Sequence, residues 1–220
     1  MAAKESGASQ PRLAGAWYSV ALLTALYAMS FLDRFILSLL AAPVSKDLNL
    51  SDVQMSLLLG AGFAVVYALS GVPIAQLLDL KERRTIVCSG VATWSLSTIA
   101  AGFANSFAML AVCRAGVALG EAVLAPAAIS LIADLFPREK RALPISVFAS
   151  MTGLMSTGAF IIGAAALNLA TAIAPVTGLA PWRCTLLLVG APGLLLAFVF
   201  LTTIKEPARV GSVGEKDEVA

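Results

Sequence analysis

The sequence predicts an all-α membrane protein whose chain crosses the bilayer six times. Its 220 residues are 59% hydrophobic and only 13% charged, with a mean hydropathy of +0.90, whereas a soluble domain carries about 25% charged residues. Six stretches are apolar over a length that suits a transmembrane helix, which needs roughly 17–25 residues. These stretches are Ala16–Ala42, Val53–Leu78, Thr85–Ala104, Phe107–Leu135, Leu143–Thr171 and Thr185–Ile204.

Local signals indicate where several of these helices begin. The first apolar run, Ala14–Val44, is too long for the hydrophobic region of a secretory signal, so we interpret it as the first spanning helix. Ser51 or Asp52 is suited to cap the second helix, and Asn105 with Ser106 predicts a tight turn between the third and the fourth.

The charges between the spans predict that both termini are cytoplasmic. Cytoplasmic loops carry an excess of Lys and Arg. One side of the predicted bundle carries eleven such residues, and the other side carries only Lys46 and Arg183. The eleven are Lys4, Arg12, Lys81, Arg83, Arg84, Arg138, Lys140, Arg141, Lys205, Arg209 and Lys216.

The spans divide the chain into three segments. Residues 1–15 form a cytoplasmic amino-terminal tail, and residues 16–204 form the six-helix transmembrane bundle. Residues 205–220 are polar, so we expect a cytoplasmic tail or the start of a linker there. This organisation predicts an integral protein of the cell (inner) membrane.

Four ionisable residues lie within the predicted spans: Asp33 and Arg34 in the first, and Arg114 and Glu121 in the fourth. A charge at bilayer depth costs roughly 2.5–3.5 kcal/mol even on the translocon scale, so such residues mark a site by default. Arg114 and Glu121 are seven residues apart and therefore share a helix face. We expect Asp33 to lie at a depth similar to that of Arg114, with Arg34 pointing to a different wall of the same cavity.

Two interpretations of these four charges stay open. In the first, they form buried ion pairs that only hold helices together. In the second, Asp33 and Glu121 carry protons while Arg34 and Arg114 face an anionic solute. Protonation of the acids leaves the two arginines unpaired, so protons and an organic anion would bind interdependently.

The sequence contains no signal for catalysis, so we expect a protein that is not an enzyme. It has no histidine, no cysteine spacing typical of zinc, no pair of nucleophile and base and no glycine-rich phosphate loop. We therefore expect no metal and no cofactor. The net charge of +2 follows from the loops and gives no support for a nucleic-acid partner. The expected partners are the lipid bilayer, a small-molecule solute and protons.

The segment after the second span resembles a loop motif of the major facilitator superfamily, Gly-x-x-x-Asp-Arg-x-Gly-Arg-Arg. Asp79, Arg83 and Arg84 match this motif. The positions of its first glycine, its first arginine and its second glycine are taken here by Ala75, Leu80 and Glu82. The resemblance implies that the three matching residues act with Asp134, at the end of the fourth span, as a conformational latch that stabilises the outward-facing state.

Longer segments are similar to spinster-like members of that superfamily, and the likeness runs from about Trp17 to Pro207. These segments are Phe31–Ser38, Leu48–Gln54, Arg114–Ala122, Pro126–Ala128, Ile132–Pro137 and Ala180–Arg183. The family's proton-linked residues fall on the four charges within the first and fourth spans. Spinster-like proteins move lysolipids and sphingoid phosphates in animals and other amphipathic or anionic solutes in bacteria.

The resemblance implies one half of a transporter. Superfamily members have twelve spans in two six-helix halves, each built from two inverted three-helix repeats around a central cavity. We expect this chain to be the amino-terminal half of a secondary transporter that works by alternating access, coupled to protons, on an organic anion or amphipathic solute. A carboxyl-terminal six-helix half would complete it. A truncated product, a self-sufficient dimer, and a non-transporting protein that binds solute as a sensor or subunit stay open as alternatives.

Overall fold

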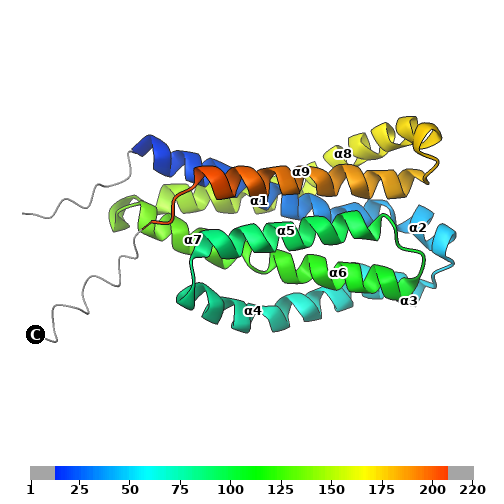
Figure 1. The fold of residues 1–220 in the computed structure, drawn as a ribbon, viewed down its shortest axis with the longest axis horizontal. Coiled ribbons are helices and arrows are strands. Elements are labelled where there is room, and N and C mark those ends of the chain that lie inside the picture. Colours follow the sequence, from blue (N-terminus) through cyan, green and yellow to red (C-terminus); the bar gives the residue numbers. More distant parts are fainter. Residues whose placement is uncertain (1–12, 208–220) are drawn as a thin grey trace, which may run out of the picture.

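A computed structural model describes residues 13–207, which form helices that run side by side along the long axis (Figure 1). The predicted tail residues 1–12 and 208–220 lie outside this described range. The long helices are α1 (Leu13–Leu39), α4 (Gly62–Leu80), α5 (Arg83–Ala101), α6 (Phe107–Glu121), α7 (Leu124–Leu135), α8 (Ala142–Thr177) and α9 (Pro181–Thr203). Shorter pieces are α2 (Ala41–Leu48), α3 (Asp52–Ser56), the π-helical turn η1 (Leu57–Ala61) and the 3₁₀ turn η2 (Arg138–Lys140). The all-α prediction is confirmed.

The start of α1 and the end of α9 lie at the same end of the bundle, which we call the termini end (Figure 1). The helices α2 and α3 lie at the opposite, far end. Helices from the two halves of the chain interleave, because α1 packs against α8 and α9, α4 packs against α6, and α5 packs against α6 and α9. Six predicted spans therefore form one bundle, with α3, η1 and α4 making up the second span and α6 and α7 making up the fourth.

Five of the six predicted spans are helical over a length, and with a composition, that suffices to cross a membrane. The third predicted span corresponds to α5, which has 19 residues but begins with two arginines and contains several Ser and Thr residues. Its more polar composition fits its place, because α5 is enclosed by α6 and α9 and so exposes little surface to lipid. Ser89 and Thr93 also bond their hydroxyls to carbonyls of the preceding turn.

Three predicted spans are interrupted, and the first of them divides near its end at Leu40, between α1 and α2. The fourth divides at Ala122 and Val123, between α6 and α7. Pro126 explains the break, because it has no N–H to donate to the carbonyl one turn earlier and its ring clashes there. The second span contains the π-helical turn η1, where the N–H of Gly62 bonds to the carbonyl of Leu57. Single π turns of this kind often occur at functional sites.

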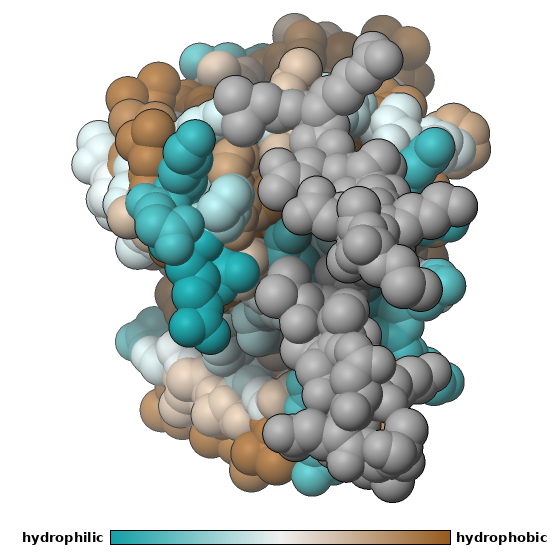
Figure 2. All heavy atoms as spheres, turned by 90° about the vertical axis from the view of Figure 1, so that its left-hand side faces the viewer, coloured by the Kyte–Doolittle hydropathy of each residue, from teal (hydrophilic) through white to brown (hydrophobic). Residues whose placement is uncertain are grey.

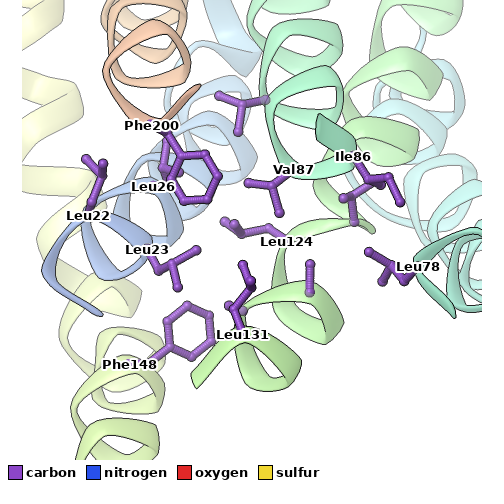
Figure 3. Packing of buried hydrophobic residues seen from close by; sticks show 14 of the residues in the cluster. Leu22, Leu23, Leu26, Leu78, Ile86, Val87, Leu124, Leu131, Phe148 and Phe200 are labelled. Atoms are coloured by element: carbon purple, nitrogen blue, oxygen red, sulfur yellow. The ribbon is translucent and has the colours of Figure 1, made fainter. Parts of the chain in front are cut away.

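Apolar side chains fill the bundle in two main clusters, one toward each end. Figure 3 shows part of the cluster near the termini end, where Leu23 and Leu26 of α1, Leu124 of α7 and Phe200 of α9 converge. Helices α5 and α6 approach closely where two glycines meet: a Cβ on Gly120 would lie 2.5 Å from the carbonyl oxygen of Gly90. Small residues at such contacts let membrane helices pack backbone to backbone.

Polar residues gather at the termini end of the bundle. Figure 2 views this end and shows hydrophilic side chains across it, with hydrophobic residues on the flanks. The loop between α4 and α5, the turn η2 and the segment after α9 supply charged residues here. An apolar flank with a charged end is the pattern expected of a bundle that spans a bilayer.

Replacement of Gly120 by Ala tests the contact between α5 and α6. The added methyl would overlap the Gly90 carbonyl and the backbone nitrogen of Trp94, so we expect a loss of about 1–3 kcal/mol or more. The measurement is the thermal unfolding midpoint in detergent micelles. Gly153→Ala is the matched control, because a Cβ there meets nothing within 4 Å. Equal midpoints for both variants would contradict the packing described.

Candidate functional site

The centre of the candidate site is an ion pair between α1 and α6. The guanidinium of Arg34 donates to one carboxylate oxygen of Glu121, from Nη2 at 2.7 Å and from Nε at 3.1 Å. The carboxylate is fully buried, whereas the Arg34 side chain keeps 32% of its surface exposed. Glu121 is the last residue of α6 and lies directly before the break that Pro126 produces. Of the two partners, only Arg34 is therefore within reach of a solute.

Aromatic rings surround the Arg34 guanidinium. Its central carbon lies 5.4 Å from the ring centroid of Phe31, 5.1 Å from that of Phe63 and 5.1 Å from that of Tyr67. Phe63 and Tyr67 are four residues apart on α4 and so lie on one helix face. Cation–π contacts of this kind contribute roughly 0.5–2 kcal/mol each, depending on how far water is excluded. The rings hold the cation in place without neutralising its charge.

Arg114 ties the backbones of two other spans to α6. Its Nε donates to the carbonyl oxygen of Leu58 in η1 at 3.3 Å, and its Nη1 donates to the carbonyl oxygen of Asp33 in α1 at 3.4 Å. The guanidinium carbon also lies 4.9 Å from the ring centroid of Phe63. Phe63 therefore contacts both arginines. The π-helical turn presents a carbonyl to a side chain, which a regular helix would use within its own backbone.

Asp33 lies beside Arg114 but does not pair with it. The Asp33 residue is 1% exposed, and neither of its carboxylate oxygens has a hydrogen-bond partner among residues 13–207. Arg114 is 6% exposed, and its Nη2 is likewise without a partner in this part of the chain. Buried polar atoms of this kind are rare in native structures, and each calls for an explanation.

The structure thus brings all four predicted charges together, but the ion pair joins Arg34 to Glu121 and not Asp33 to Arg114. Asp33 and Arg114 meet at one depth, as the sequence indicated, although through a backbone carbonyl. Arg34 pairs with Glu121 instead of facing a separate wall. Sequence reasoning missed Phe63 and Tyr67, because two aromatic residues one turn apart in an apolar span are ordinary. Within residues 13–207, no group of three or more His, Cys, Asp or Glu side chains is placed to hold a metal.

A second charged cluster lies at the termini end and is centred on Arg83, the first residue of α5. Its Nη1 forms an ion pair with Asp134 at the end of α7 and donates to the hydroxyl of Ser130 at 2.8 Å. Its Nε forms an ion pair with Glu206 at 2.8 Å. The Arg83 side chain is only 3% exposed, so both pairs hold a buried cation.

Glu206 is a member of this cluster that the sequence interpretation missed. It follows α9 in a segment expected to be a polar tail, yet its carboxylate also accepts from the backbone N–H of Arg84 at 2.8 Å. That N–H lies in the first turn of α5, where no helical partner exists, and Glu82 supplies no side-chain cap. A carboxylate at this place also interacts favourably with the helix dipole. Asp79 lies at the end of α4 with an exposed side chain.

These observations define a polytopic α-helical membrane protein with opposite charges buried deep within its helices. The family within this class is shown by its sequence: the model of the Major Facilitator Superfamily matches residues 23–219. The chain belongs to the Major Facilitator Superfamily, as its motifs predicted. It is therefore a member of a family of transporters and not of enzymes.

Individual relatives are named as transport proteins. The chain is 32% identical over 189 residues to an MFS-type efflux pump of Mycolicibacterium smegmatis, covering 86% of this chain and 42% of the pump. It is 29% identical over 171 residues to a probable L-galactonate transporter of Escherichia coli, covering 77% of this chain and 35% of that protein. The chain thus spans less than half the length of these relatives.

A solved structure agrees with the fold. A bacterial homolog of the human lysosomal transporter Spinster, in an inward-facing and unoccupied conformation, superposes with a TM-score of 0.83 at 32% identity. The superposition covers 90% of this chain and 45% of the homolog. The described residues therefore have the fold of one half of a spinster-like transporter.

The π-helical turn is tested by Gly62→Ala. A Cβ at this position would lie 2.7 Å from the carbonyl oxygen of Leu57, so the turn must shift together with the Leu58 carbonyl that binds Arg114. We expect a lower thermal unfolding midpoint, equivalent to about 1–3 kcal/mol. Gly60→Ala is the control from the same turn, since its Cβ meets nothing within 4 Å. A midpoint for Gly62→Ala as high as that of the control would contradict this description of the turn.

The role of Glu206 as a helix cap is tested by Glu206→Ala. Loss of the charged acceptor leaves the Arg84 N–H without its partner, and hydrogen bonds to charged groups contribute about 1.5–3 kcal/mol. We expect hydrogen exchange of the Arg84 amide, followed by NMR, to become faster by roughly tenfold or more. Glu139→Ala removes an exposed carboxylate from the same end of the bundle and should leave this rate unchanged. Equal exchange in both variants would refute the cap.

Proposed function

We propose that this chain is the amino-terminal half of a proton-coupled secondary transporter for an organic anion or amphipathic solute, working by alternating access. The observation that carries the proposal is the ion pair of Arg34 and Glu121, in which only the cation has an exposed side chain. A solute anion that reaches this point competes with Glu121 for the same guanidinium. Such competition links solute binding to the protonation state of a buried acid.

The charge balance determines whether a bound proton favours or opposes binding of an anion. With Asp33 and Glu121 ionised, the four charges sum to zero, and the site offers little net attraction to an anion. A proton on Glu121 removes the partner of Arg34 and leaves a cation that an anionic group can bind. Protonation and anion binding therefore support each other. By linkage, the solute favours proton uptake as strongly as the proton favours solute binding.

The aromatic surround suits a solute with an apolar part beside its acid. Three aromatic rings border the Arg34 guanidinium, those of Phe31, Phe63 and Tyr67. Phe35 follows Phe31 one turn later on α1, and the centroids of these two rings are 6.2 Å apart. An apolar group has rings to lie against while its acidic group meets the cation. The same surface also accepts a small sugar acid, such as the substrate named for the Escherichia coli relative.

The termini-end cluster is proposed as the conformational latch. Arg83 joins the start of α5 to Asp134 at the end of α7 and to Glu206 after α9. Arg84 belongs to the same group through its contacts with Glu206 and the Ile204 carbonyl. We include Asp79 in the proposed latch because it matches the loop motif. With Lys and Arg enriched in the loops at this end, we propose that the end is cytoplasmic and that the protein resides in the inner membrane.

A carboxyl-terminal six-helix half is the proposed partner. The chain covers 45% of the superposed spinster homolog. The spans Asp52–Leu80 and Arg138–Thr177 are each only 22% buried over their most apolar stretch, against 61% for the span Phe107–Leu135. A second half would cover part of these faces and supply the other wall of the solute cavity.

The coupling is tested by Glu121→Gln in proteoliposomes made with the protein as purified from its own membranes. We expect solute counterflow in the wild type to rise as the pH falls, and this dependence to become weaker in the variant, because the neutral amide leaves Arg34 without a titrating partner while Asp33 still titrates. Two labelled probes separate the solute classes: L-galactonate as a polar anion and lysophosphatidate as an amphipathic one. Glu139→Gln is the control on an exposed carboxylate.

Two results would overturn the proposal. An unchanged pH dependence in Glu121→Gln would exclude this acid as the coupling site. Binding of a probe without counterflow would identify a sensor or a binding subunit instead of a transporter. Thermal unfolding of each variant verifies that the bundle is intact before transport is compared.

A further inference from the structure

A small cavity lies between α1, α5, α6 and α9, next to the ion pair but separate from it. Its volume is about 10 Å³, and Asp33, Thr98 and Arg114 are its polar lining residues. The remaining lining side chains are aliphatic. Thr98 is 3% exposed, so all three polar residues are more than nine-tenths buried. Nothing in the sequence motifs points to Thr98.

Three atoms around this cavity have no hydrogen-bond partner within residues 13–207: both carboxylate oxygens of Asp33, and Nη2 of Arg114. The other donors of Arg114 are directed elsewhere, since Nε binds the Leu58 carbonyl and Nη1 binds the Asp33 carbonyl. A buried polar atom left unpaired destabilises a fold, and a charged one does so more strongly. A ligand in the cavity that satisfies all three atoms is therefore strongly favoured.

We propose that this cavity is a binding site for one ordered water molecule, held by Asp33, Thr98 and Arg114. The room is that of about one water, and buried waters make about three hydrogen bonds to groups otherwise unsatisfied. The water accepts from Arg114 Nη2 and donates to the Asp33 carboxylate. The Thr98 hydroxyl is its third partner and fixes its position.

The chemistry of the lining excludes the alternatives. A sodium or potassium ion suits Asp33 and Thr98, but the Arg114 guanidinium lines the same space and repels it. A chloride ion suits Arg114 and is repelled by Asp33. Water alone both donates and accepts, so it satisfies a carboxylate and a guanidinium together. The water also accounts for two opposite charges that lie side by side without a direct ion pair.

This inference deepens the proposed function, because it rests on Asp33 as a proton-carrying residue. The water is the group through which a proton reaches and leaves the Asp33 carboxylate, and Thr98 is a positioning residue that acts through it. Ionised Asp33 is stabilised by the water, so loss of the water favours the protonated form.

A high-resolution crystal structure of the chain gives the direct test. We expect density for one water within about 2.7–3.2 Å of the Asp33 carboxylate, Thr98 Oγ1 and Arg114 Nη2. Thr98→Val keeps the side-chain shape without the hydroxyl and should lose this density, whereas Thr98→Ser should retain it. A cavity without density in the wild type, or unchanged density in Thr98→Val, would overturn the proposal. If Thr98→Val does not fold, Thr98→Ala decides the role of the hydroxyl.

The pH profile of counterflow gives a second test of the positioning role. We expect its midpoint to move to higher pH by about one unit in Thr98→Val, since the ionised carboxylate loses a hydrogen-bonded partner. Thr98→Ser should restore the midpoint. Thr93→Val makes the same substitution on the same helix, at a hydroxyl already bonded to the Ser89 carbonyl, and should leave the midpoint unchanged. An unmoved midpoint in Thr98→Val would refute the positioning role.

The two proposals fail in distinguishable ways. Density for the water in a protein that shows no counterflow would leave the water site intact and overturn the transport proposal. A cavity without density, in a protein whose counterflow has a weaker pH dependence in Glu121→Gln than in the wild type, would do the reverse.

Discussion

The ion pair between Arg34 and Glu121 is the interaction on which the arrangement of the site depends. Burial of a carboxylate among apolar helices is costly, and Arg34 offsets this cost for Glu121 by supplying the opposite charge. The pair joins α1 to α6, and the same two helices carry Asp33 and Arg114, which meet through the Asp33 carbonyl. It also holds the guanidinium among Phe31, Phe63 and Tyr67. Arg114 is held in a similar way, because its guanidinium donates to the carbonyls of Leu58 and Asp33.

The sequence carries enough information to predict the helices, the fold class and the identity of the four charges. Apolar length and loop charge are properties of short segments, so they can be recognised without any tertiary contact. The cap predicted at Ser51 or Asp52 is equally local, and the structure has Ser51 as the cap of α3. At Asn105 and Ser106 the sequence predicted a turn, and Ser106 caps the start of α6. The resemblance to the superfamily, now confirmed, also supplied the grouping of Arg83 with Asp134.

Features that arise from contacts between helices could not be predicted in this way. Which arginine meets Glu121 depends on how the helices are placed in the bundle. The π-helical turn at Leu57–Ala61, whose Leu58 carbonyl binds Arg114, likewise has no unique sequence signal. Phe63, Tyr67 and Thr98 gain significance only from what lies opposite them. Pro126 is different, because it was visible in the sequence and explains the break after Glu121. Glu206 was assigned to a tail by its polar surroundings, although its partner lies 123 residues away in the chain.

The attachment of Glu206 to the start of α5 has a mechanical consequence. The chain leaves the bundle after α9, but its last described residues are anchored to Arg83 and Arg84 rather than hanging from α9 alone. A pull on the following segment is therefore delivered to the α5 terminus, and from there through Arg83 to α7. Movement of any domain joined at this point is therefore transmitted to α5 and α7 through the Arg83 guanidinium.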